Sequence, residues 1–135
     1  MNITPDNIIK LEPNEIFVMG TNFGGHHGAG AALTAFKKFG AIYGQGTGLQ
    51  GQSYGIATKD SNLKVLSLSR IQLQINTFIK FAKDNPQLRF LTTAIGTGLS
   101  GYKHSDIAPL FFTKGRLPDN ISLPKEFWDY QPKNL

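Results

Sequence analysis

The sequence of 135 residues contains no cysteine, a single tryptophan and only two methionines. Without cysteine the chain has no disulfide, no thiolate ligand for zinc and no cysteine nucleophile. The lack of disulfides is also typical of proteins that work in a reducing compartment. Enzyme classes and metal sites that depend on a thiol are therefore excluded.

Long hydrophobic runs are also missing. No apolar stretch approaches the roughly 20 residues that are needed to cross a bilayer. The first residues, Met1–Asp6, have neither the basic start nor the apolar core of a secretory signal. The sequence therefore predicts a cytoplasmic protein without a membrane partner.

Acidic residues are scarce. The chain contains nine Asp and Glu and fourteen Lys and Arg, which gives a net charge of +5. Such a balance attracts anionic partners, either a nucleotide or a nucleic acid, although it also serves solubility alone. The only histidines are His26, His27 and His104, and adjacent histidines on a loop point in different directions. We therefore expect no metal site and no cofactor.

Hydrophobic residues make up 40% of the chain, and the length suits a single domain over residues 1–135. Short apolar runs predict strands, and apolar residues at three- and four-residue spacing predict helices. The expected strands are 16–19, 53–58, 89–95, a short one at 41–43 and an edge strand near 121–123. The expected helices are about 31–39, 67–84 and one that begins at Ser105 or Asp106. Alternation of this kind predicts an α/β fold with a mostly parallel sheet, helices on both faces and ligands at the carboxyl ends of the strands.

The first glycine-rich segment, residues 20–30, follows a predicted strand and opens a helix, where free N–H groups attract phosphate. The amide of Asn22 can donate to and accept from a ribose hydroxyl. His26 and His27 can each contact a phosphate or act as an acid or base. The candidate catalytic residues are therefore Asn22, His26 and His27, and the candidate ligand contacts are Thr21, Gly24, Gly25, Gly28 and Gly30.

A second glycine-rich segment, residues 96–102, also directly follows a predicted strand, the one over 89–95. Its hydroxyls and N–H groups favour an anion, and its aromatic residue suits either a ligand ring or the core. The candidate contacts are Gly96, Thr97, Gly98, Leu99, Ser100, Gly101 and Tyr102. A third segment, 44–54, is either a wall over a polar ligand or a surface loop. The alternative for all three segments is that their glycines only turn the chain.

Two of these segments resemble macro domains, a family that binds ADP-ribose. Residues 17–22 followed by 24–30 resemble the family's V-N-A-A-N and G-G-G-x-A segment, and residues 93–102 resemble its P-A-I-S-T-G-I-F-G-Y-P loop. Residues 48–59 are similar to its G-Y-x-L-x-A-K passage, and residues 20–60 resemble a group of small bacterial and phage proteins with macro-like loops. The family's G-D-I motif, whose Asp contacts adenine, has no counterpart.

The resemblance implies a three-layer α/β/α sandwich with a mixed sheet, and binding of ADP-ribose or a related nucleotide. Asn22 would contact the distal ribose, and the two glycine-rich loops would hold the ribose and the diphosphate. No Asp or Glu lies in either loop. Whether the protein is also a hydrolase of ADP-ribose derivatives is therefore left open. The alternatives are a basic nucleic-acid-binding module and a non-enzymatic structural or partner-binding protein.

Overall fold

The computed structural model describes all residues 1–135 and contains a five-stranded mixed sheet in the order β2-β3-β1-β4-β5. β3 and β4 each pair in parallel with β1, β5 pairs in parallel with β4, and β2 pairs antiparallel with β3 at one edge. The strands are β1 (Glu15–Asn22), β2 (Gly48–Gln50), β3 (Ser53–Lys59), β4 (Arg89–Thr92) and β5 (Ile121–Ser122). The predicted α/β fold with a mostly parallel sheet is confirmed.

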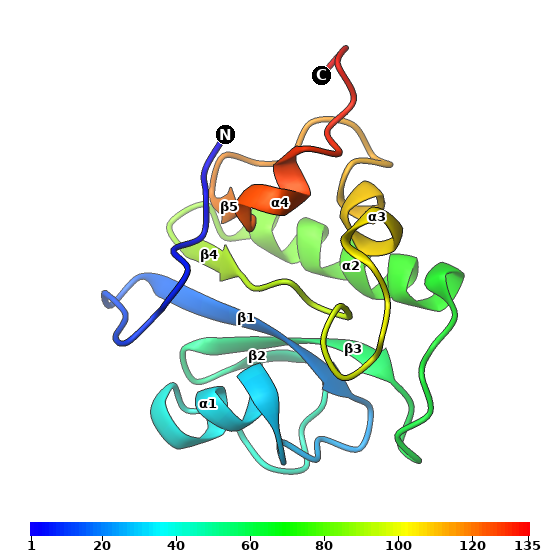
Figure 1. Cartoon of the computed structure of the whole chain (residues 1–135). Coiled ribbons are helices and arrows are strands. Elements are labelled where there is room, and N and C mark those ends of the chain that lie inside the picture. Colours follow the sequence, from blue (N-terminus) through cyan, green and yellow to red (C-terminus); the bar gives the residue numbers. More distant parts are fainter.

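Helices cover both faces of this sheet, with α1 on one face and α2 on the other (Figure 1). α2 is the longest, and it begins where the hydroxyl of Ser67 accepts a hydrogen bond from the N–H of Arg70 at 3.3 Å. The helices are α1 (Gly30–Lys38), α2 (Leu68–Asp84), α3 (His104–Ile107), the 3₁₀ turn η1 (Ala108–Phe111) and α4 (Lys125–Trp128). None of them has the length and apolar character to cross a membrane.

β1 lies at the centre of the sheet and is buried on both faces. Successive side chains of a strand point to opposite faces. Ile16 and Val18 therefore join the larger core, which contains α2 and the C-terminal elements, while Phe17 and Met19 join a smaller core against α1. The continuous apolar run of this strand follows from helices on both sides.

The larger core is built around aromatic rings from three elements. The ring of Tyr54 in β3 lies 5.1 Å from that of Phe78 in α2, and the Phe78 ring lies 5.4 Å from that of Phe90 in β4. Burial raises the pKa of the Tyr54 phenol above its ordinary value. Phe127 of α4 is also fully buried and packs on Phe111. The C-terminal segment therefore completes this core.

Three predicted boundaries differ from the structure. The strand expected at 41–43 does not form, because the N–H of Ile42 bonds the side chain of Gln50 at 2.8 Å instead of a neighbouring strand. The strand at this edge is β2, a few residues later, whereas the edge strand expected near 121–123 is present as β5. β4 ends at Thr92, since a tight turn joins the N–H of Ile95 to the carbonyl of Thr93 at 2.8 Å. The helix α4 was not expected from the sequence.

Candidate functional site

The loops that leave β1 and β4 diverge above the sheet. Chain connections in parallel sheets are right-handed, so crossovers that run in opposite directions place their helices on opposite faces. From β1 the chain runs to β3 through α1, and from β4 it runs toward β5 through α3 on the other face. Because β1 and β4 are neighbours, their carboxyl ends form the topological switch point at which α/β proteins bind ligands.

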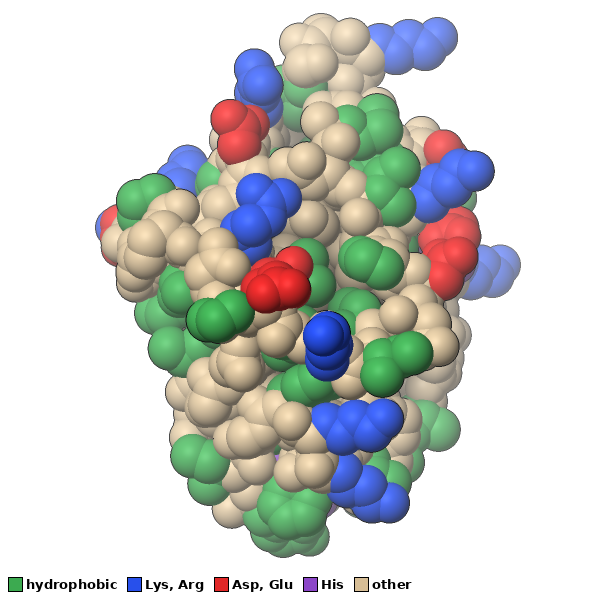
Figure 2. All heavy atoms as spheres, turned by 90° about the vertical axis from the view of Figure 1, so that its left-hand side faces the viewer, with side chains coloured by type: hydrophobic (Ala, Val, Ile, Leu, Met, Phe, Trp, Pro, Cys, Tyr) green, Lys and Arg blue, Asp and Glu red, His purple; other side chains and the backbone are tan.

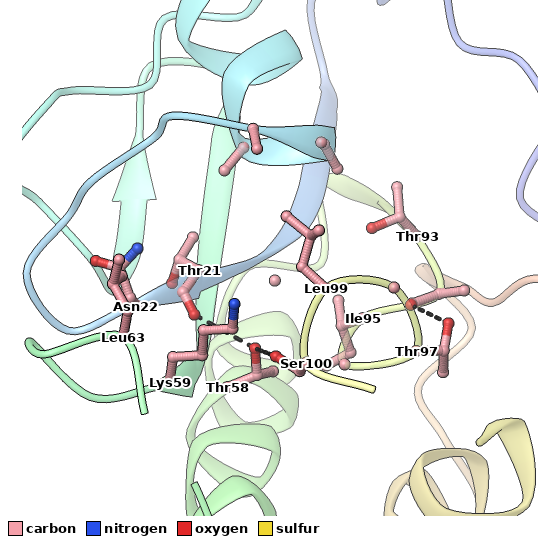
Figure 3. Close-up of a pocket in the computed structure, with 18 of the residues that line it drawn as sticks. Thr21, Asn22, Thr58, Lys59, Leu63, Thr93, Ile95, Thr97, Leu99 and Ser100 are labelled. Atoms are coloured by element: carbon pink, nitrogen blue, oxygen red, sulfur yellow. Dashed lines mark hydrogen bonds between the residues drawn. The ribbon is translucent and has the colours of Figure 1, made fainter. Parts of the chain in front are cut away.

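A cavity of about 530 Å³ lies at this switch point (Figure 3). Its volume falls within the range of small-molecule sites. The lining comes from the end of β1, the start of α1, the end of β3 and the loop after β4. The lining residues are Gly20, Thr21, Asn22, His26, Gly28, Ala29, Gly30, Ala31, Ala32, Thr58, Lys59, Leu63, Thr93, Ala94, Ile95, Gly96, Thr97, Gly98, Leu99 and Ser100.

Free backbone N–H groups of α1 and the residues before it line one wall. The residue before the helix, Ala29, offers no side-chain cap, and no acidic residue lies in the first turn. The N–H groups of residues 28–32 donate to no acceptor of the chain. The first N–H groups of a helix carry a partial positive charge, so this wall attracts an anion.

The loop after β4 supplies a second set of unpaired N–H groups to the lining. Those of Gly96, Gly98, Leu99 and Ser100 donate to no acceptor of the chain, although the neighbouring N–H of Thr97 bonds a backbone carbonyl. Gly96 has φ of +74°, a left-handed conformation that favours glycine. Two segments far apart in the sequence therefore bring unpaired donors to one cavity.

The charge of the lining is positive. Lys59 is the only Lys or Arg in it, and no Asp or Glu belongs to it. The ion pairs of the protein are Lys80–Asp84 and Arg116–Asp119, so the ammonium of Lys59 is not neutralised by a carboxylate. Figure 3 shows Lys59 beside Thr58 and Ser100, at the end of β3. An anionic ligand would meet this cation without displacing a partner.

An irregularity in the pairing of β1 and β3 places Thr58 at the cavity. Thr21 pairs with Ala57 and Asn22 pairs with Lys59, so Thr58 has no partner in β1. Its hydroxyl lies 2.9 Å from the hydroxyl of Ser100. Irregularities of this kind redirect side chains next to functional sites.

Asn22 is buried, and its side chain holds the loop that follows it. Its Oδ1 accepts a hydrogen bond from the N–H of His26 at 2.9 Å, and its Nδ2 donates to the carbonyl of His26 at 3.0 Å. The sequence predicts that this amide contacts a ribose. Each amide atom keeps one further hydrogen-bonding position, so Asn22 can do so only while it also holds the turn.

The third glycine-rich segment, residues 44–54, packs closely against the first one, residues 20–30. A Cβ on Gly25 would lie 2.3 Å from the backbone carbon of Gly44, and a Cβ on Gly46 would lie 2.2 Å from the carbonyl oxygen of Asn22. The hydroxyl of Thr21 donates to the carbonyl of Gly46. Residues 44–54 do not line the cavity, so they are not the wall over a ligand that the sequence suggested.

The two adjacent histidines have different places. His26 is exposed and lines the cavity. His27 is 1% exposed and lies away from the cavity, with Nε2 at 2.9 Å from the carbonyl of Ile42 and 3.1 Å from Oε1 of Gln50. Both partners are acceptors, so Nε2 of His27 carries the hydrogen and donates. The expectation of a catalytic His27 is therefore wrong for this arrangement, because the side chain is buried under residues 42–50.

Several other candidate contacts also lie outside the lining. The hydroxyl of Tyr102 donates to the carbonyl of Leu66 at 2.6 Å, and its ring packs on the larger core. The hydroxyl of Thr97 lines the cavity but donates to the carbonyl of Ala94 at 2.7 Å. The candidates that the cavity does not include are Gly24, Gly25, His27, Gly101 and Tyr102, whereas all the others line it.

Sequence reasoning missed the residues that β3 and the turn after it contribute. Thr58 was expected at the end of a strand and Lys59 at the end of the passage similar to macro domains, neither of them as a ligand contact, and Leu63 was not singled out. Leu63 has φ of +64°, is 52% exposed and lines the cavity opposite the loop that carries Leu99, which is 72% exposed. An unpaired lysine at the end of a predicted parallel strand was the available signal.

No three His, Asp or Glu side chains come together as ligands of a metal ion would. No protein-family model matches the chain, and neither a curated protein nor a solved structure matches it. Any statement about what the cavity binds therefore depends on its own chemistry and on the motifs of the sequence.

Proposed function

We propose that this protein binds ADP-ribose or a closely related nucleotide in the cavity between β1 and β4. The observation that carries the proposal is the meeting of two sets of unpaired N–H groups in one cavity, one from residues 28–32 and the other from Gly96 and residues 98–100. Pre-arranged donors of this kind suit the oxygens of a diphosphate, since hydrogen bonds to charged groups are the strong ones.

The electrostatics of the cavity support an anionic ligand. Lys59 adds a cation that no carboxylate neutralises, and the lining contains no acidic side chain that would repel a phosphate. The macro-domain resemblance of residues 17–30 and 93–102 supports ADP-ribose in particular, because these two segments form the walls of the cavity. Asn22 lines the same cavity, and its amide keeps one N–H and one oxygen lone pair that are available to a ribose hydroxyl.

The proposed function is binding of the nucleotide and does not include its hydrolysis. No Asp or Glu lines the cavity, so no carboxylate is present to activate a water molecule. In a hydrolytic reaction the phosphate of the substrate or His26 would have to orient that water. The lining as it stands supports recognition more directly than bond cleavage.

A nucleic-acid-binding module is the second candidate, and the net charge of +5 favours it. A single-stranded nucleic acid needs a continuous basic groove interleaved with aromatic side chains. Figure 2 shows one face on which several lysine and arginine side chains follow one another in the lower half of the view, while others lie apart near acidic side chains. The net charge and this run of cations are the observations that keep the second candidate open to test.

Calorimetry and thermal unfolding with ADP-ribose, AMP and a short single-stranded RNA test the proposal. ADP-ribose should bind and raise the melting temperature, because a ligand at 100 times its Kd adds about 2.7 kcal/mol to the free energy of unfolding. AMP, which lacks the diphosphate and the second ribose, should bind more weakly. No heat and no thermal shift with millimolar ADP-ribose would refute the proposal. Affinity for RNA that falls steeply with salt, in the absence of ADP-ribose binding, would establish the alternative.

A further inference from the structure

His26 is an exposed side chain whose position is fixed from several directions. Its backbone N–H and carbonyl are both bonded to the side chain of Asn22, at 2.9 and 3.0 Å. Its Nδ1 lies 3.1 Å from the hydroxyl of Tyr43. On the opposite edge of the ring, Cδ2 and Nε2 lie so close to Gly24 that a Cβ there would meet both at 2.9 Å.

Such ordering does not come from burial. Fixing an exposed side chain costs conformational entropy, and His26 gains no hydrophobic burial in return. Its neighbour His27 is the buried member of the pair and packs under residues 42–50. His26 therefore lines the cavity with a ring whose Nδ1 has a partner in Tyr43 and whose Nε2 has none, an arrangement that suits a ligand.

The partner on Nδ1 decides what the other nitrogen can do. A phenol is a better donor than acceptor, so Tyr43 donates to Nδ1 of the neutral ring, and the hydrogen of the imidazole then resides on Nε2. In the charged ring both nitrogens carry hydrogen, and Nε2 is again a donor. Nε2 is also the ring nitrogen that has no partner in the chain.

We infer that Nε2–H of His26 donates a hydrogen bond to an anionic oxygen of the bound nucleotide, and that Tyr43 is a positioning residue for it. The inference rests on the proposed function of the cavity and names a contact within it. It places His26 with Lys59 as a donor to the ligand and not as a base toward water.

Nitrogen-15 NMR of the histidine rings at alkaline pH, where imidazoles are neutral, tests the arrangement without a ligand. In the wild type, His26 should carry its hydrogen on Nε2. Tyr43→Phe should give a mixture of the two tautomers, whereas Tyr130→Phe, which removes the hydroxyl of another exposed tyrosine, should leave His26 unchanged. A wild-type His26 with its hydrogen on Nδ1 would overturn the inference.

Affinity for ADP-ribose tests the contact itself. His26→Leu should weaken binding about tenfold, as expected for one lost hydrogen bond to a charged group. His26→Gln places an N–H close to the position of Nε2 and should restore most of the affinity, and both variants keep the backbone bonds to Asn22. Tyr43→Phe should weaken binding about threefold through the mixed tautomer.

The outcomes separate this inference from the proposed function. If the wild type binds ADP-ribose and His26→Leu binds equally well, the contact is refuted while the function stands. Equal losses in His26→Leu and His26→Gln would also refute the donor role. If the wild type binds no ADP-ribose, the proposed function and the contact are refuted together.

Discussion

A carboxylate placed at Gly98 should weaken nucleotide binding roughly a hundredfold and leave the fold intact. A Cβ at this residue meets no atom within 4 Å, and Gly98 does not have a positive φ, so a side chain fits without strain. Its N–H is one of the unpaired donors of the cavity, and Gly98 is exposed. Gly98→Glu therefore adds one negative charge beside the place where we propose the diphosphate, and Gly98→Ala is the matched control.

The expected loss follows from Coulomb's law. Two unit charges about 6 Å apart repel by about 3 kcal/mol at an effective dielectric constant of about 20. Gly98 is exposed, so solvent screening reduces this to about half for each charge of the ligand. A diphosphate carries two charges, which brings the loss back to about 3 kcal/mol, or roughly a hundredfold in Kd.

Isothermal calorimetry with ADP-ribose measures this loss, and circular dichroism checks that both variants unfold at the wild-type temperature. Gly98→Ala should bind within about twofold of the wild type, because it leaves the N–H in place. The repulsion should also shrink at high salt, since an exposed charge is screened. Wild-type affinity in Gly98→Glu would refute the placement of the phosphates next to this loop.

Three further predictions concern a charge, a turn and a buried phenol. Lys59→Met should weaken ADP-ribose binding about tenfold, because one charged hydrogen-bond donor of the cavity is lost. Lys83 is exposed and lies outside the cavity, so Lys83→Met should leave the affinity unchanged. Calorimetry measures both affinities. Gly25→Ala should lower the free energy of unfolding by about 2 kcal/mol or more, because its Cβ would lie 2.3 Å from a backbone atom and φ is +69°. The control Gly28→Ala should not do so, because a Cβ there meets open space. Urea denaturation compares the two variants. Because burial raises the pKa of Tyr54, the folded protein favours the neutral phenol. The contribution of this group to the free energy of unfolding should be constant below about pH 10 and fall as the pH rises further. Chemical denaturation at alkaline pH should show that Tyr54→Phe removes this part of the fall.

Each of these has an outcome that contradicts it. Equal losses of affinity in the two lysine variants would mean a general effect of net charge. A Gly25→Ala protein as stable as Gly28→Ala would show that the loop can move away from residue 44. An unchanged decline of stability at high pH in Tyr54→Phe would mean that other groups, such as deprotonating lysines, cause it.

Local patterns in the sequence identified most of the fold. The spacing of apolar residues predicted α2 to within a residue at each end, and the run at 16–19 identified the central strand, which is buried on both faces. The Gly-rich segments were expected at the carboxyl ends of two strands, and both line the cavity there. Of the short elements, β5 and α3 were expected close to where they form, whereas β2 and α4 were not, because they have too few residues to show a period.

The sequence predicted the residues of the site less well than it predicted the fold. His26 and His27 are chemically identical and adjacent, and no local pattern tells which one faces the cavity and which one is buried under Ile42 and Gln50. Tyr102 follows the glycine-rich loop directly, yet its hydroxyl bonds Leu66 and its ring joins the core. Thr58 reaches the cavity through an irregularity in strand pairing that leaves no mark in the sequence.

The sequence by itself determined which segments turn tightly, which faces are apolar and where unpaired N–H groups begin a helix, because these depend on neighbours along the chain. Only the tertiary structure decided that β1 and β4 lie side by side, since strand order depends on the packing of helices that are distant in sequence. That adjacency brings residues 28–32 and 96–100 to one cavity with Lys59. The charge and the donors are local properties of the chain, whereas their convergence on one ligand is a property of the sheet.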